Sequence, residues 1–329
     1  MTLSGTSMEI LDLRHFTAAM LRPVLETEGD LWQDRLHWNY QNSTRLLMQY
    51  LDNRMLPGYA AAAGEQVAGY AFCVYEESKA VIGDVFAMDG IEGERWPDSR
   101  EMEATLLNHL LELLVNSPQV DRIESQLLIH SSGTFAGQFR AAGFDIFRRL
   151  FLVQQLEGRW NAPRIKLPAG LELRLWRDED LAPAARLISE AYRDHPDSMI
   201  NDQYRTVHGS MRFLNNIVRY AGCGVFSPPV SYVITERGSR ELAALILGSR
   251  VSTGSGHITQ VCVHPKFRHQ GLGRAMLQLS AHGFLKQGAE EVSLTVTEAN
   301  RPAITLYTDE GYTCAHTFDA TVWQRRWIA

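Results

Sequence analysis

The strands and helices expected in the second half of the chain recur, more loosely, in the same order in the first half. Alternating apolar residues predict strands, and apolar residues three and four positions apart predict helices. In the second half these patterns predict, in order, strand 171–176, helix 178–192, a helix near 203–220, strands 231–236, 242–251 and 257–263, helix 273–288, strand 291–297 and helix 302–311. In the first half they predict strand 8–13, helix 16–27, a hairpin over 58–77, strand 80–88, helix 103–115, strand 122–129 and helix 135–144. Such a repeat indicates two copies of one α/β unit.

The last helix of each copy is followed by a glycine and an aromatic residue. The pair is Gly143-Phe144 in the first copy and Gly311-Tyr312 in the second. The two pairs are separated by about the length of one domain. This spacing supports a duplication.

A segment rich in proline and glycine separates the two copies and predicts an interdomain linker. The expected division of the chain is a first domain over 1–158, a linker over 159–170 and a second domain over 171–329. We expect a last pair of strands, near 312–318 and 320–327, to close the second domain.

Composition excludes several classes of protein. The 329 residues suit two ordinary domains, and 45% hydrophobic with 21% charged residues is typical of globular chains. A net charge of −6 gives no overall basic field, so we expect neither nucleic acid nor a membrane surface as a partner. We expect no secretion signal, because no cationic segment followed by an apolar run begins the sequence, and no apolar run is long enough to cross a bilayer. The cysteines Cys73, Cys223, Cys262 and Cys314 are widely spaced, which predicts reduced thiols in a cytoplasmic protein.

The sequence RHQGLG, residues 268–273, lies between strand 257–263 and helix 273–288. Gly271 and Gly273 let the backbone approach a ligand closely, and the N–H groups at a helix start favour an anion. The loop is neither a Walker A motif nor a Rossmann fingerprint. Taken alone, it is equally compatible with a pyrophosphate site and with a plain turn.

The segments VCVHPKFRHQGLGRAML and NRPAITLYTDEGY together resemble the GNAT superfamily of acyl-CoA-dependent N-acyltransferases. The family loop has the pattern Arg/Gln-x-x-Gly-x-Gly/Ala after a strand. A later family motif has the pattern Asn-x-x-Ala-x-x-Leu-Tyr-x-x-x-Gly-Phe, and Tyr312 replaces its phenylalanine here. The resemblance is strong over about 171–327 and weak over 8–155. It implies an α/β (α+β) fold of two tandem GNAT-like domains, each a mixed, mostly antiparallel, splayed sheet flanked by helices.

The resemblance also implies acetyl-CoA as the acyl donor, with no metal. The loop backbone would bind the CoA pyrophosphate with added charge from Arg268 and Arg274, and the strand before it would pair with the pantetheine arm. Tyr307 would protonate the departing thiolate. The implied acetyl-CoA contacts are Val261, Cys262, Val263, Arg268, His269, Gln270, Gly271, Leu272, Gly273, Arg274, Asn300 and Tyr307.

The general base is open between two residues. His257 aligns with a glutamate that is the base in histone-acetyltransferase-like members, and Glu298 lies at a strand end near Asn300. A strand-edge histidine without a catalytic task is the simpler interpretation of His257. Cys262 lacks an obvious basic partner, so its position predicts a packed thiol rather than an acylated nucleophile.

The first copy lacks the family's cofactor residues. At the position of the loop, residues 88–101 carry Asp89, Glu92 and Glu94, which would repel pyrophosphate, and Phe139 stands where the tyrosine is expected. We therefore expect a degenerate first domain without an acyl-CoA loop, whose own ligand, if it has one, is open.

The sequence favours transfer of an acetyl group from acetyl-CoA to a primary amine by direct attack in a ternary complex. Two alternatives are an acyl-CoA sensor or scaffold without catalysis, and an O-acyltransferase. The acceptor is expected to be a small-molecule amine or a peptide amine, held near residues 192–216, and the protein a monomer or homodimer.

Overall fold

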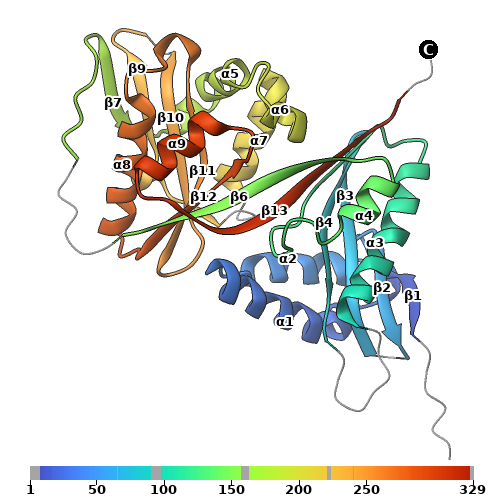
Figure 1. Cartoon of the computed structure of the whole chain (residues 1–329). Coiled ribbons are helices and arrows are strands. Elements are labelled where there is room, and N and C mark those ends of the chain that lie inside the picture. The colour runs from blue at the N-terminus through green and yellow to red at the C-terminus, as the bar shows by residue number, and fades with distance from the viewer. Residues whose placement is uncertain are drawn as a thin grey trace, which may run out of the picture. The chain divides into compact units, whose positions relative to one another are not determined.

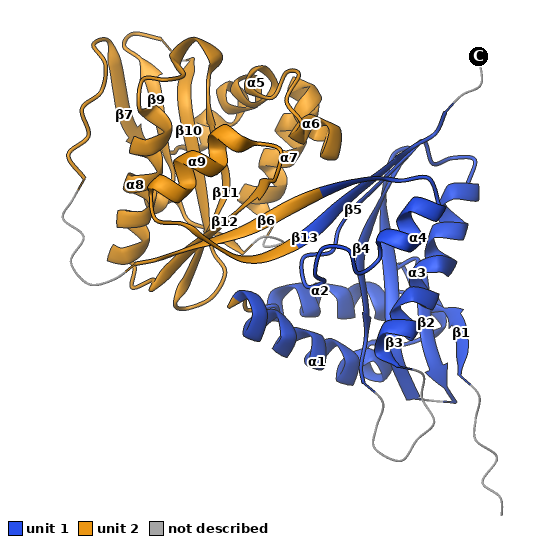
Figure 2. Ribbon diagram, in the orientation of Figure 1, with its two compact units in different colours: residues 1–36, 40–147, 318–329 blue, residues 37–39, 148–317 orange. Residues whose placement is uncertain are grey.

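The computed structural model describes residues 8–64, 66–89, 98–156, 163–220, 224–239 and 241–326. The chain forms two compact units (Figure 2). Their residues are 1–36, 40–147 and 318–329 in the first unit, and 37–39 and 148–317 in the second.

The first unit is a mixed sheet with helices on both faces (Figure 1). Its own strands, in sheet order, are β1 (Glu9–Asp12), β2 (Gly58–Ala63), β3 (Gln66–Glu76), β4 (Lys79–Ala87) and β5 (Arg122–Gln126). Its helices are α1 (Ala18–Leu36), α2 (Gln41–Asp52), α3 (Ser99–Asn116) and α4 (Ala136–Ala141). The β4–β5 pair is parallel, and the other pairs among these strands are antiparallel.

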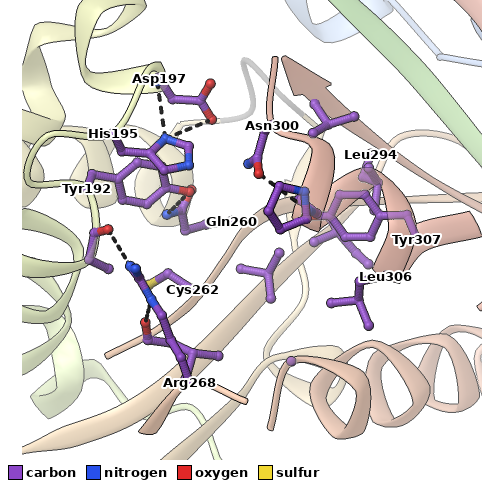
Figure 3. A pocket seen from close by; sticks show the side chains of 18 of the residues that line it. Tyr192, His195, Asp197, Gln260, Cys262, Arg268, Leu294, Asn300, Leu306 and Tyr307 are labelled. Carbon is purple, nitrogen blue, oxygen red and sulfur yellow. Dashed lines mark hydrogen bonds and ion pairs between the residues drawn. The ribbon is translucent and has the colours of Figure 1, made fainter. Parts of the chain in front are cut away.

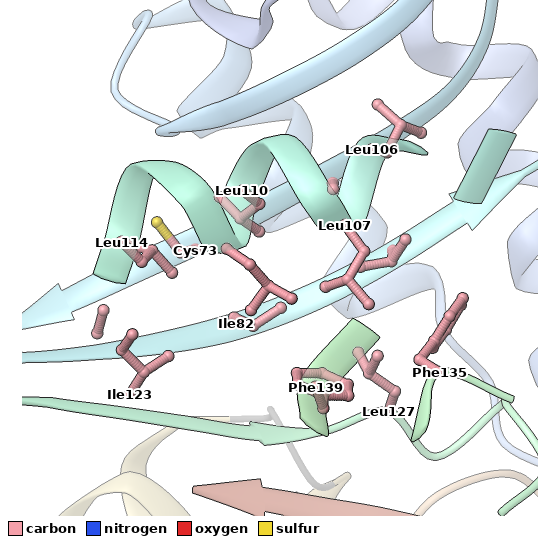
Figure 4. Packing of buried hydrophobic residues seen from close by; sticks show 14 of the residues in the cluster. Cys73, Ile82, Leu106, Leu107, Leu110, Leu114, Ile123, Leu127, Phe135 and Phe139 are labelled. Atoms are coloured by element: carbon pink, nitrogen blue, oxygen red, sulfur yellow. The ribbon is translucent and has the colours of Figure 1, made fainter. Parts of the chain in front are cut away.

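Side chains that alternate along β3 meet different helices, because successive residues of a strand point to opposite faces. Tyr70 donates its hydroxyl proton to Glu28 of α1, whereas the adjacent Ala71 belongs to the apolar cluster under α3 and α4. Figure 4 shows that cluster, in which leucines of α3 such as Leu110 cover strand residues such as Ile82.

The second unit repeats this architecture. Its own strands are β7 (Leu171–Leu175), β8 (Val225–Phe226), β9 (Tyr232–Glu236), β10 (Leu242–Arg250), β11 (Ser255–Val263) and β12 (Glu291–Thr297). Its helices are α5 (Leu181–Ala191), α6 (Asp197–Ile200), α7 (Val207–Arg219), α8 (Leu272–Lys286) and α9 (Arg301–Asp309). Strand β10 is buried on both faces: Leu245 packs with α5 and α7, and Ile246 packs with α8. The expected class, a mostly antiparallel mixed sheet flanked by helices, is confirmed.

Two strands are shared between the units. Strand β6 (Asp145–Gln155) follows the last helix of the first unit, yet residues 149–155 pair with β12 of the second. Strand β13 (Thr313–Gln324) follows the last helix of the second unit, yet residues 320–324 pair with β5 of the first. The units are therefore not the contiguous halves 1–158 and 171–329 expected from the sequence, because the last strand of each half pairs with a strand of the other unit.

The expected last strand pair, near 312–318 and 320–327, is wrong. One uninterrupted strand, β13, covers Thr313–Gln324. No glycine or proline occurs in this stretch to reverse the chain. Asp319, in the middle of the strand, instead accepts hydrogen bonds from the Ser132 hydroxyl and the Gly133 N–H.

Candidate active site

The parallel strands β11 and β12 separate part of the way along their length (Figure 1). They pair from Ser255–Glu291 to Ile258–Leu294, although β11 continues to Val263. A β-bulge in the β10–β11 pairing lies at Leu247/Gly248, next to the point where β11 leaves β12. Bulges bend strands, so this irregularity is the local cause of the opening.

A cavity of about 650 Å³ occupies the opening. Its walls come from β11, β12, the loop before α8, the start of α9 and the end of α5 (Figure 3). Every expected acetyl-CoA contact except Gln270 lies in its wall. Val263 directs its carbonyl away from β10, because that oxygen accepts a hydrogen bond from the Arg268 guanidinium at 3.4 Å. Val261, two residues earlier on the same strand, therefore also directs its backbone polar groups toward the opening.

The loop before α8 adopts an unusual backbone. His269 and Gly271 have φ values of 61° and 79°, in the left-handed region that favours glycine. Gly271 is the N-cap of α8, and no side chain of the described residues caps the helix. The first N–H groups of the helix are thus available to an anion. A Cβ at Gly271 would meet no atom within 4 Å, so the space in front of the loop is open. These features make the loop a candidate site for an anionic group.

The two arginines expected to add charge are held by neighbours. Arg268 donates to the Ala191 carbonyl at 2.8 Å, which ties the loop to the end of α5. Arg274 forms ion pairs of 2.9 Å with Asp309 and Glu310. Both arginines line the cavity, but these contacts already use part of their charge and hydrogen-bonding capacity.

Tyr307 lies on α9 and faces the cavity with only 8% of its surface exposed. Burial raises the pKa of Tyr307 well above its ordinary value, and the charge of Asp197 raises it further, while Arg149 opposes both. The phenol therefore carries its proton at neutral pH and is able to donate it. Asn300 also lines the cavity, and its side-chain oxygen caps α9 by accepting the Ala303 N–H at 3.3 Å.

Cys262 is also in the cavity wall, where burial raises its thiol pKa to about 12. A thiol of this pKa is almost entirely protonated at neutral pH, and the thiolate is the nucleophilic form. The packed thiol expected from the sequence agrees with this environment.

Neither residue considered as the general base lines the cavity. His257 is 5% exposed, with its ring centroid 4.9 Å from that of Trp38 and 6.1 Å from that of Phe151, and its Nδ1 lies 2.9 Å from the Ser293 hydroxyl. Burial lowers the pKa of His257 to about 3, so the ring is neutral and packed. Glu298 lies in the turn after β12, and its backbone N–H donates to a carbonyl of β6.

Residues that the motifs did not identify form the opposite wall of the cavity. Tyr192, His195, Asp197 and Tyr204 belong to the segment 192–216 expected near the acceptor. Tyr192 accepts a hydrogen bond from the Gln260 side chain at 3.2 Å, which connects this segment to β11.

Arg149 reaches the cavity from β6, a strand contributed by the first half of the chain. Its guanidinium donates to the Thr295 hydroxyl at 3.2 Å. No sequence signal identified Arg149, because no strand was expected over 145–155.

Within the described ranges, no helix is long and apolar enough to span a membrane. The same residues contain no cluster of three or more histidine, cysteine or acidic side chains arranged to hold a metal ion.

The acetyltransferase (GNAT) family matches residues 185–312, which lie in the second unit. The mycothiol acetyltransferase of Geodermatophilus obscurus is 25% identical over 333 residues, covering 98% of this chain and 94% of that protein. The mycothiol acetyltransferase of a Nocardioides species is 25% identical over 192 residues, which cover 54% of this chain and 61% of that protein. A tandem GNAT protein from the clavulanic acid biosynthesis pathway has a similar fold, with a TM-score of 0.61, 15% identity and coverage of 98% of this chain and 100% of that one. Residues 185–312 of this chain thus carry the acetyltransferase (GNAT) family sequence, and the whole chain has the fold of a tandem GNAT protein.

Proposed function

We propose that the second unit transfers an acetyl group from acetyl-CoA to a primary amine, by direct attack within a ternary complex. One observation carries this proposal: a single cavity brings together the free edge of β11, the uncapped start of α8 and the buried phenol of Tyr307. These three features match the pantetheine, the pyrophosphate and the departing sulfur of one acetyl-CoA molecule.

Acetyl-CoA supplies an activated acyl group, and the protein positions it. Main-chain groups of Val261 and Val263 hold the pantetheine arm, and a backbone N–H of β11 stabilises negative charge on the acyl oxygen. Tyr307 keeps its proton until the thiolate leaves and then donates it. Direct attack is favoured over an acyl-enzyme because the Cys262 thiol remains protonated.

The acceptor is an amine on either a small molecule or a peptide. Relatives named mycothiol acetyltransferase favour a small molecule, and their identity of 25% leaves the specific compound open. The segment 192–216 supplies the cavity wall that faces such an acceptor.

The test has two steps. Calorimetry first measures acetyl-CoA binding to the full chain, with an expected stoichiometry of one per chain. A thiol-release assay then screens acetyl transfer to aliphatic amines, aminoglycosides and peptides. Failure to bind acetyl-CoA would contradict the proposal. Binding without transfer to any amine would favour a sensor, and an ester product would favour an O-acyltransferase.

A further inference from the structure

Asp197 is a buried carboxylate in the cavity wall that the family motifs do not explain. It lies at the start of α6 with 8% of its surface exposed. Among the described residues that line the cavity, it is the only carboxylate. A buried negative charge is costly unless partners or a ligand compensate it.

The partners of Asp197 account for only part of its hydrogen-bonding capacity. The Thr297 hydroxyl donates to Oδ1. The other oxygen, Oδ2, lies 3.9 Å from Nδ1 of His195 and accepts no hydrogen bond from the described residues. An ionised carboxylate offers about four lone-pair sites, so Asp197 has unused acceptor capacity.

His195 is poorly suited to accept a proton in this site. Its Nδ1 accepts the backbone N–H of Asp197 at 3.2 Å, so the neutral ring carries its hydrogen on Nε2. The lone pair of Nδ1 is thus already used by this hydrogen bond, and burial disfavours the charged ring by lowering the pKa of His195. The imidazole therefore positions Asp197 through its backbone, and the free acceptor that faces the cavity is the carboxylate.

Asp197 and Tyr307 lie on two sides of the cavity, with Asn300 between them (Figure 3). The carboxylate is near enough for its charge to raise the pKa of Tyr307. A substrate nitrogen between a proton acceptor and a proton donor is in the arrangement that acyl transfer to an amine requires.

We propose that Asp197 binds the ammonium group of the acceptor and takes its proton, and so selects primary amines that are protonated in solution. This inference rests on the proposed acetyl transfer. The ammonium passes one proton to Asp197, and its nitrogen then forms a C–N bond to the acyl carbon. The C–S bond breaks, and the sulfur takes the proton of Tyr307. The acylated nitrogen then gives a second proton to the Tyr307 phenolate, and Asp197 releases its proton to solvent.

The test compares Asp197→Asn with Asp178→Asn in the full chain. Asp178 is exposed and lies outside both the cavity wall and the segment 192–216. With an aliphatic primary amine, D197N should lower kcat/KM by about 100-fold. D178N should behave as wild type, and both variants should keep the acetyl-CoA affinity of wild type.

An aromatic amine gives a second readout that a purely structural role would not change. Such an amine is already unprotonated at pH 7, so the loss caused by D197N should shrink to less than about tenfold. An equal loss with both amines would overturn the role of Asp197 as proton acceptor, and no loss with either would overturn the whole inference.

A measurement on the wild type keeps the inference testable if D197N fails to fold. The alcohol analogue of a good acceptor should inhibit at least about tenfold more weakly than an ammonium analogue that is not acetylated. Equal inhibition would contradict ammonium binding. Failure of the wild type to bind acetyl-CoA would instead contradict the proposed function, so the two failures are distinguishable.

Discussion

Both units contain an opening between two parallel strands, but the strand edge at the opening has different hydrogen-bond partners in the two units. In the first unit β4 and β5 pair only from Lys79–Arg122 to Ile82–Ser125, although β4 continues to Ala87. A bulge in the β3–β4 pairing lies next to the point of separation, as it does in the second unit. The backbone geometry of the proposed acetyl-CoA site is therefore present in both units.

In the first unit, side chains of the same unit occupy the free strand edge. The Val85 carbonyl accepts a hydrogen bond from His130 Nε2 at 2.7 Å, and the Ala87 N–H donates to the Glu103 carboxyl at 3.3 Å. Counted from the bulge, these backbone positions correspond to Val261 and Val263, the expected pantetheine partners. The first unit thus satisfies internally the groups that the second unit leaves for a ligand.

The helix after the opening differs as well. Phe139 of α4 is buried in the apolar cluster with Phe135 and Leu127, and it has no hydroxyl to donate (Figure 4). The acidic loop expected to repel pyrophosphate lies largely outside the described residues. The difference between the units teaches that the splayed sheet is only a framework. We infer that acetyl-CoA binding depends on an unpaired strand edge, and we expect one acetyl-CoA per chain.

The largest expected effect comes from a variant that places an acidic residue in the loop before α8, as the first copy has in residues 88–101. Gly271→Glu places a carboxylate where the pyrophosphate is expected and forces a side chain into a left-handed backbone. Since charge-assisted hydrogen bonds contribute roughly 1.5–3 kcal/mol each, the loss of two should weaken acetyl-CoA binding by at least about 100-fold, measured by calorimetry.

Gly288→Glu is the matched control. Gly288 follows the same helix at its other end, with a φ of 81° and open space around its Cβ. It should lose similar stability and keep its acetyl-CoA affinity. If G271E still binds acetyl-CoA like wild type, the assignment of the loop is wrong.

The second-largest expected effect comes from replacing Tyr307 with phenylalanine, the residue that the first unit has at the corresponding position, Phe139. Tyr307→Phe removes the proton donor while keeping the ring, so kcat should fall by about 100-fold at an unchanged acetyl-CoA Kd. Tyr312→Phe is the control, because the buried Tyr312 hydroxyl has no hydrogen-bond partner in the described chain. Steady-state thiol release measures both. Equal rates for Y307F and wild type would remove Tyr307 from the mechanism.

Local sequence patterns predicted much of each unit. The run of leucines in α3, the alternating strand β7 and the glycine that begins α8 all lie where they were expected within a few residues. These elements are set by hydrophobic periodicity and by backbone preferences, which neighbouring residues determine.

The exchange of β6 and β13 could not be predicted in this way. Each of these strands pairs with a strand more than a hundred residues away in the sequence. The local sequence of a strand does not indicate which sheet edge it will join. The same limit applies to the site. The loop and Tyr307 lie in motifs, and Asp197 lies in the segment 192–216 expected near the acceptor, although no pattern assigned it a role. Arg149 was not expected, because it reaches the cavity from β6 through tertiary packing.

The smallest expected effect concerns Glu103, which binds the strand edge at the opening of the first unit. It changes the stability of the fold and leaves acetyl-CoA binding unchanged. Burial raises the pKa of Glu103 from 4.5 to about 7, and the Ala87 N–H opposes this shift. At a pH between 4.5 and about 7, the Glu103 carboxyl is deprotonated in the unfolded chain and protonated in the folded chain. The free energy of unfolding therefore falls as pH rises through this range, by roughly 3 kcal/mol.

Glu103→Gln replaces this acid with a neutral side chain of the same shape, so urea unfolding from pH 5 to pH 8 should show a smaller loss of stability than in wild type. Glu28 and Asp84, a buried pair whose pKa values are also raised, keep part of the slope in the variant. Glu101→Gln, an exposed change on the same helix, should leave the slope unchanged. Acetyl-CoA affinity should be the same in all three proteins, because the closed strand edge takes no part in binding. A change in affinity in E103Q alone would mean that the first unit also holds the ligand, and that its opening is less completely occupied than its hydrogen bonds indicate.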